Sequence, residues 1–133
     1  MRQKSVLTID DARKMMAACK VEAQKNKWAV TIAILDEHGA ALLLERLDGA
    51  GPMSAEVAMG KARTAALTGR PTKFFEDRIK DRPAFLTFPT PGVMFQGGAP
   101  IIHQGDCIGA IGVSGVQSHE DEQVAKAGIA VLG

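Results

Sequence analysis

Apolar residues near the start of the chain recur every three or four positions, which is the spacing of one face of an α-helix. These positions are Ile9, Ala12, Met16, Cys19 and Ala23. Thr8 stands three residues before Asp11, and this capping pattern predicts where the helix begins. The sequence therefore predicts an amphipathic helix that ends near Gln24 and packs on another layer.

Two strand-like apolar runs follow this helix, Trp28–Leu35 and Ala40–Arg46. The residues between them include Gly39, which adopts a positive φ readily, so the two runs predict a β-hairpin. An alanine-rich helix is expected next, with Ser54 as its N-cap and Leu67 near its end. Its small side chains indicate a close approach to a neighbouring backbone.

The last third of the chain is predicted to be rich in strands, at Val93–Gln96, Pro100–His103 and Cys107–Ser114. A short charged helix over Lys73–Lys80 precedes them, and Ser118 with Asp121 repeats the capping pattern at the start of a terminal helix. Hairpins in place of helical crossovers favour an antiparallel sheet covered by helices, which is an α+β fold. Residues 1–133 are expected to form one domain.

The amino-acid composition excludes some classes of protein but does not indicate which ligand is bound. Sixteen basic and fifteen acidic residues leave a net charge of +1, so a nucleic-acid partner is not expected. The longest apolar stretches, Ala29–Leu35 and Ala40–Leu44, are much shorter than a membrane span. No apolar leader precedes the first helix, and we expect a cytoplasmic protein. Cys19 and Cys107 lie outside any metal-ligand spacing and are expected to be reduced core residues.

Two histidines are candidate metal ligands, because neutral imidazole is a common donor to metal ions. His38 lies in the predicted hairpin turn, and His103 ends a predicted strand. An isolated histidine is more often a surface or hydrogen-bonded residue, so both interpretations stay open at this point.

Charged residues gather around the alanine-rich helix and the loop before it. Arg46 ends a strand, Asp48 begins the loop, and Glu56, Lys61 and Arg63 lie on the helix. Lys61 lies beside the apolar face, where a lysine either reaches water or meets an acidic group. The sequence is compatible with a solvated or ion-paired Lys61 and with one that binds an anionic ligand.

Glycines and a serine at predicted strand ends form a second candidate group, Gly97, Gly98, Ser114 and Gly115. Exposed backbone N–H groups at such positions can bind an anion such as a carboxylate. Turn geometry alone is the competing explanation for these residues.

Four blocks of sequence, residues 45–50, 61–66, 97–101 and 109–115, are followed by Asp121 in an order that resembles the GlcG/HbpS family of haem-degrading or haem-binding domains. The resemblance spans nearly the whole chain. It implies an α+β domain of profilin- or PAS-like appearance, with a central antiparallel sheet of about five strands, and self-association into dimers or larger rings up to octamers. The family motif residues carried here are Arg46, Asp48, Lys61, Gly98, Ser114, Gly115 and Asp121.

The leading hypothesis is a cytoplasmic homo-oligomer that binds a small carboxylated ligand, with haem as the candidate that the resemblance implies. The ligand would lie in a pocket between the sheet and the alanine-rich helix or across a subunit interface. Arg46 and Lys61 would hold the carboxylates, backbone N–H groups of the glycine-rich strand ends would assist, and His38 or His103 would ligate haem iron. The alternative is a cofactor-independent lyase or isomerase for a small carboxylated or aromatic metabolite, with Lys61 or Glu56 as the proton-transfer group. A third hypothesis is a regulatory module that binds another protein.

Overall fold

The computed structural model describes residues 1–90 and 92–132, and its centre is an antiparallel sheet in the order β2-β1-β4-β3. The elements run as α1 (Ile9–Lys25), β1 (Thr31–Asp36), β2 (Ala41–Arg46), α2 (Met53–Thr68), α3 (Thr72–Asp81), the 3₁₀ helix η1 (Pro83–Thr87), β3 (Gly98–His103), β4 (Asp106–Ser114), α4 (Ser118–Ile129) and the 3₁₀ helix η2 (Ala130–Leu132). The α+β prediction is confirmed. No helix among the described residues is long and apolar enough to cross a membrane.

The sheet has four strands in the described residues, and the expected strand over Val93–Gln96 is absent from it. The N–H of Val93 donates to the carbonyl of Gly60 on α2 at 3.0 Å, and the N–H of Gln96 donates to the Glu76 side chain at 3.4 Å. This segment therefore makes its backbone contacts with helices, which is why the prediction of about five strands was too high.

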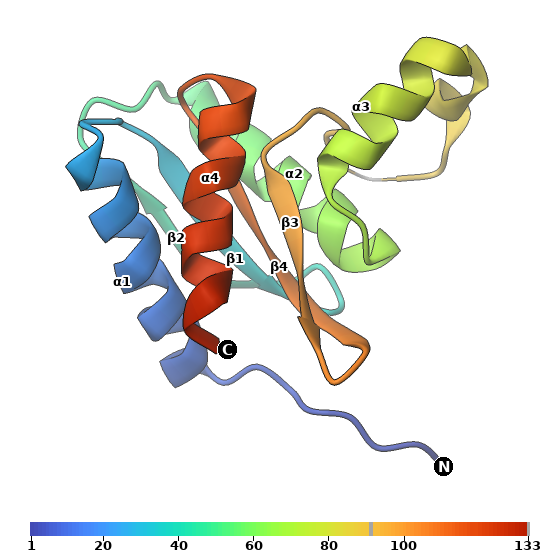
Figure 1. The fold of residues 1–133 in the computed structure, drawn as a ribbon, viewed down its shortest axis with the longest axis horizontal. Helices are drawn as coiled ribbons and strands as arrows, with labels where there is room; N and C mark the ends of the chain where they lie inside the picture. Colours follow the sequence, from blue (N-terminus) through green and yellow to red (C-terminus); the bar gives the residue numbers. More distant parts are fainter. Residues whose placement is uncertain (91, 133) are drawn as a thin grey trace.

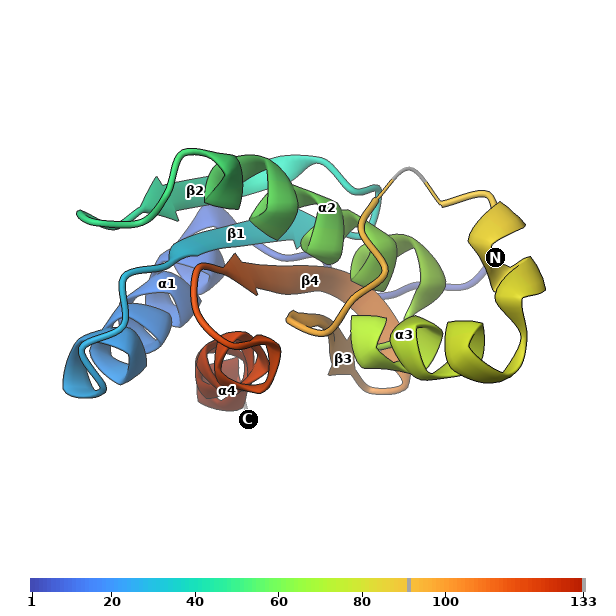
Figure 2. The ribbon, with the colours of Figure 1, turned by 90° about the horizontal axis from the view of Figure 1, so that it is seen from above.

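Helices cover both faces of the sheet. Helices α1 and α4 lie side by side on one face, and α2 lies on the other (Figure 1), so the sheet separates α2 from the pair when it is viewed from above (Figure 2). Ile32 and Ile34 of β1 belong to the core under α1 and α4, whereas Ala33 and Leu35 face α2. Successive side chains of a strand point to opposite faces of the sheet. Because helices cover both faces here, alternate residues of β1 belong to two different cores.

Gly112 explains how closely α2 approaches the sheet. A Cβ atom at this position would collide with the carbonyl oxygen of Ala58 and the backbone nitrogen of Ala62. Both alanines are fully buried. The close approach predicted from the small residues of this helix is confirmed.

Helix starts follow the predicted signals only in part. Thr8 caps α1 with a capping box to Asp11, as predicted. Ser54 does not cap α2, because it is already the second residue of that helix, and its hydroxyl bonds to the Thr31 hydroxyl at 2.7 Å and to the Gly51 carbonyl. Ser118 does not cap α4 either, since Gln117 forms the capping box.

The two cysteines have different surroundings. Cys19 is fully buried, Cys107 is half-buried, and both thiols are free. Burial raises the pKa of the Cys19 thiol to about 12. The prediction of reduced cysteines agrees with this arrangement, although only Cys19 belongs fully to the core.

Candidate functional site

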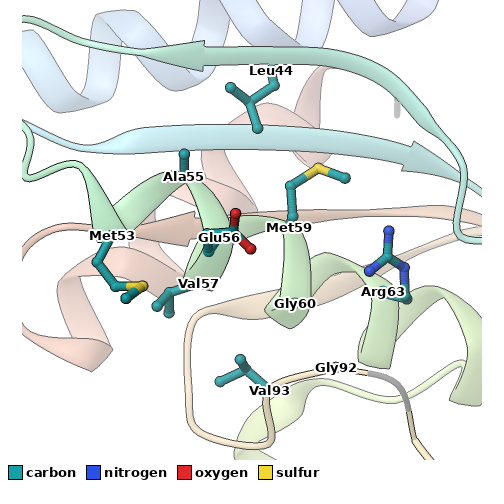
Figure 3. Close-up of a pocket in the computed structure, with 10 residues that line it drawn as sticks. All are labelled: Leu44, Met53, Ala55, Glu56, Val57, Met59, Gly60, Arg63, Gly92 and Val93. Carbon is teal, nitrogen blue, oxygen red and sulfur yellow. The ribbon is translucent and has the colours of Figure 1, made fainter.

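A pocket of about 560 Å³ lies beside α2, between this helix, β2 and the turn at residues 92–93 (Figure 3). We call it the α2 pocket. Six apolar side chains form its walls, Leu44, Met53, Ala55, Val57, Met59 and Val93. The charged residues that line it are Glu56, which is exposed, and Arg63, which is half-buried. The volume and the mainly apolar walls are typical of small-molecule sites.

The helical repeat of α2 directs these side chains away from the sheet. Positions 56, 59 and 63 are three and four residues apart, so Glu56, Met59 and Arg63 share one side of the helix. Gly60 has no side chain, and this allows Val93 to lie directly on the helix; a Cβ atom at Gly60 would lie 2.6 Å from the Val93 side chain. The missing side chain therefore creates one wall of the pocket.

Lys61 points to the opposite side of α2 and is only 1% exposed. Its ammonium donates to the carbonyl of Val113 at 2.9 Å and to the Asp121 carboxylate at 3.0 Å. The ring of Phe95 lies over it, 5.0 Å from Nζ to the ring centroid. Burial lowers the pKa of Lys61, and the Asp121 charge opposes that shift. The solvated alternative is therefore wrong, and the lysine is ion-paired in the interior.

Asp121 completes a buried ion pair between α2 and α4. Its second carboxylate oxygen accepts the N–H of Val116 at 3.1 Å. Burial raises the pKa of Asp121, while Lys61 and this N–H oppose the shift. Because Asp121 balances the Lys61 charge within the protein, no anionic ligand is needed to compensate it.

The glycines at residues 97 and 98 make room for Lys61. A Cβ atom at Gly97 would lie 2.5 Å from Nζ of Lys61, and Gly97 has a φ of 136°, which L side chains rarely adopt. The Gly98 N–H donates to the Thr72 hydroxyl at 2.9 Å. The expectation that Gly98 supplies a free donor to an anion is wrong, because that donor is already bonded.

Arg46 and Lys61, predicted to hold the same ligand, occupy different environments. Arg46 lies on the exposed edge strand β2 and lines a separate hollow of about 670 Å³. Asp48 and the half-buried Trp28 line the same hollow. Ser114 and Arg46 both pair with Thr31, so they lie in one row across the sheet, and Gly115 follows at the end of β4.

The candidate histidines lie outside the lining of the α2 pocket. His38 is exposed in the β1–β2 turn, with Nδ1 3.2 Å from a Glu37 carboxylate oxygen. His103 is half-buried at the end of β3. Across residues 1–90 and 92–132, no group of three or more metal-ligating side chains converges.

Sequence reasoning named Glu56 as a candidate and placed Arg63 in the same charged group without giving it a role, and it missed Met53 and Met59 as lining residues. The signal was present in the spacing of Glu56, Met59 and Arg63 on the side of the helix opposite its alanines. What the spacing could not show is that Val93, at least 30 residues later in the chain, closes that side.

Comparison with known protein families shows which family the chain belongs to. The family model described as haem degrading protein HbpS-like matches residues 7–130. The chain belongs to the HbpS-like family. Protein GlcG of Escherichia coli K12 is 44% identical to this chain over 115 residues. The aligned region covers 86% of this chain and 85% of GlcG.

Solved structures of the HbpS-like fold superpose closely on this chain. A double mutant of Streptomyces reticuli HbpS has a TM-score of 0.91 at 36% identity, and covers 100% of this chain and 91% of that one. A PduOC:heme complex has a TM-score of 0.86 at 27% identity, and covers 95% of this chain and 94% of that one. The predicted family is thus confirmed.

Proposed function

We propose that this protein binds haem, or a closely related apolar ligand with carboxylates, in the α2 pocket. The observation that carries the proposal is the pocket itself, which combines apolar walls, a guanidinium and two thioether sulfurs on one side of α2. Support also comes from the PduOC relative, whose structure is a complex with haem.

The donor set of the pocket fits the chemistry of haem. Leu44, Val57 and Val93 offer apolar surface to a flat ring. The planar fork of Arg63 suits a propionate, and Met53 or Met59 offers the soft sulfur that haem iron accepts. Bound haem would supply a redox-active iron to the site.

The Lys61–Asp121 pair supports the pocket indirectly. Val93 forms one wall, and Phe95 and Gly97 of the same segment rest on Lys61. Lys61 is therefore proposed as a positioning residue that holds the 92–97 segment against α2. His38 and His103 lie outside the lining of the α2 pocket, so they would ligate haem iron only if haem bound elsewhere on the chain. Arg46 with Asp48, Ser114 and Gly115 remains a candidate site for a second anionic group.

The enzymatic alternative depends on Glu56. Its carboxylate is exposed in the α2 pocket, where it can reach the proton of a bound metabolite. Lys61 has no comparable exposure. Glu56→Gln would abolish turnover of such a substrate, whereas haem binding in the same pocket would persist.

The test of the haem proposal is a haemin titration followed by the Soret band. We expect the wild-type protein to saturate at one haem per chain. Arg63→Gln is expected to weaken binding about tenfold to a hundredfold, which is the effect of losing a charge-assisted hydrogen bond. Met59→Leu keeps the volume and apolar character but removes the sulfur, so a shifted Soret band would identify Met59 as an iron ligand.

The matched control is Arg13→Gln, because Arg13 is exposed on α1, on the other face of the sheet. It is expected to bind haemin as the wild type does. Equal affinity of the wild type, Arg63→Gln and Arg13→Gln would remove the α2 pocket as the site. His38→Ala and His103→Ala test the two histidines in the same titration, and an unchanged Soret position in both would exclude them as ligands.

A further inference from the structure

A second pocket lies in a part of the molecule that the haem proposal does not use. Four of the five phenylalanines gather in α3 and the turn after it, Phe74, Phe75, Phe85 and Phe88. This region stands to one side of the sheet and its covering helices (Figure 2). The rings of Phe75 and Phe88 are 5.3 Å apart, and those of Phe85 and Phe88 are 6.2 Å apart and nearly parallel, with an angle of 22° between them.

These rings form the walls of a pocket of about 510 Å³ that we call the aromatic pocket. Its opposite side is formed by the end of α2 and the residues after it, Leu67, Thr68 and Arg70. Pro89 and Thr90 close one end. Its lining exposes more apolar than polar surface, and Leu67 and Phe88 are 49% and 40% exposed. Such concave apolar surface is typical of a small-molecule site.

Arg70 is the one charged residue in the lining. Its guanidinium lies 4.3 Å from the centroid of the Phe74 ring, and within residues 1–90 and 92–132 no carboxylate lies within 4 Å of it. Arg78 lies over the same ring at 4.9 Å but does not line the pocket. Arg70 is exposed, its guanidinium lies over the Phe74 ring, and its positive charge has no carboxylate partner among these residues.

The rim of the pocket is held by hydrogen bonds of its threonines. The Thr68 hydroxyl donates to the carbonyl of Thr64 at 2.6 Å, and the Thr90 hydroxyl lies 3.0 Å from the Thr64 hydroxyl. The Thr90 end of the pocket is thus bonded to α2, whereas the Thr68 bond lies within that helix. A preformed pocket lowers the entropic cost of binding a ligand.

We propose that the aromatic pocket binds a planar aromatic monocarboxylate that carries no metal. The ring would pack among Phe75, Phe85 and Phe88, where offset and edge contacts favour a second aromatic group. The carboxylate would pair with the guanidinium of Arg70, whose fork matches its geometry. The lining contains no histidine, cysteine or methionine, so a metal-bearing ligand gains nothing there that it does not gain in the α2 pocket.

The experiment is calorimetric titration with 1-naphthoate and with its neutral amide, 1-naphthamide. We expect the wild-type protein to bind one 1-naphthoate per chain and to bind the amide at least tenfold more weakly. Arg70→Gln should lose at least tenfold in affinity for the carboxylate and leave the amide unchanged. Phe88→Ala removes an exposed ring and should weaken both probes.

The matched control is Arg78→Gln, which removes the other cation that lies over the Phe74 ring without changing the pocket lining. It should bind 1-naphthoate within twofold of the wild type. Protein saturated with haemin should also bind 1-naphthoate unchanged, which separates this proposal from that of the α2 pocket.

Three results would overturn the proposal. The first is the absence of binding heat with folded wild-type protein, and the second is equal affinity for the acid and the amide. The third is a dimer that dissociates to monomers in Phe88→Ala, with 1-naphthoate binding only to the monomer. This third result would show that a second copy of the chain covers the pocket.

Discussion

Lys61 shows what one buried charge costs and what compensates it. Removing an ammonium from water carries a large desolvation penalty, and the Asp121 carboxylate and the Val113 carbonyl offset it. The sequence placed Lys61 beside the apolar face of its helix and named an acidic partner as one alternative. It could not identify Asp121 as that partner, because Asp121 reads equally well as a helix-start residue 60 positions later.

Breaking this pair should destabilise the fold strongly. Lys61→Met leaves the Asp121 charge buried without its partner, and we expect a loss of about 3 to 5 kcal/mol in the free energy of unfolding, measured by urea denaturation. The double variant Lys61→Met/Asp121→Asn removes both charges and should recover part of that loss. Lys126→Met is the control, because its ammonium is exposed and should contribute less than about 1 kcal/mol. Equal stability of Lys61→Met and Lys126→Met would contradict the buried pair.

Cys19 should make the protein sensitive to alkali. Its thiol has an ordinary pKa of 9.0 and a folded pKa of about 12. Between these values the unfolded chain releases a proton that the folded chain keeps, so stability falls as the pH rises, by about 1.4 kcal/mol per pH unit. Cys19→Ala should show a shallower alkaline decline in denaturation experiments from pH 8 to 11. Parallel pH profiles for the two proteins would exclude Cys19 as the cause.

At the scale of elements, the sequence predicted correctly those features that depend on residues close together in the chain. The Thr8 cap and the hairpin around Gly39 depend on residues close in sequence, and both were predicted. The prediction of a strand at Val93–Gln96 was wrong because this segment packs on Gly60, a residue without a side chain on a helix that is distant in the sequence. A pocket was predicted between the sheet and the alanine-rich helix. Ala58 and Ala62 pack directly on the sheet, so the α2 pocket lies beside the helix, where Val93 closes it.

The packing of α2 on β4 should tolerate no side chain at Gly112. Gly112→Ala would force its Cβ atom against the backbone of Ala58 and Ala62, and we expect about 1 to 3 kcal/mol of destabilisation. Gly51→Ala is the control, since no atom lies within 4 Å of the Cβ position there. Thermal denaturation of both variants measures the difference, and a neutral Gly112→Ala would mean that α2 lies farther from the sheet.

At the scale of the whole molecule, the resemblance to the GlcG/HbpS family predicted what the periodicity of apolar residues could not, namely the family. The four sequence blocks identified the family, and the fold of its solved members followed. The blocks did not locate a ligand, because the residues they contain are divided between a buried ion pair, a separate hollow around Trp28 and close backbone contacts. The side chains that line the α2 pocket lie mostly between the blocks.

Self-association is the prediction that belongs to this scale. The edges of the sheet are β2 and β3, and Leu44 and Ile102 on these strands are 41% and 52% exposed. Edge strands and exposed apolar side chains favour association of copies. Light scattering at micromolar concentration should give at least twice the subunit mass of 14.1 kDa, and a monomeric mass would contradict the expectation.

The most direct test of haem binding in the α2 pocket uses the six methionines as probes. Ferric haemin is paramagnetic and broadens the NMR signals of nearby ¹³C-labelled methionine methyl groups, whereas zinc protoporphyrin is a diamagnetic control. At one equivalent of haemin, Met53 and Met59 should lose their signals first, because both line the pocket. Met15 and Met16, buried on the other face of the sheet, should keep theirs. Equal loss at Met15 and Met16, or no loss at Met53 and Met59, would contradict haem binding at this site.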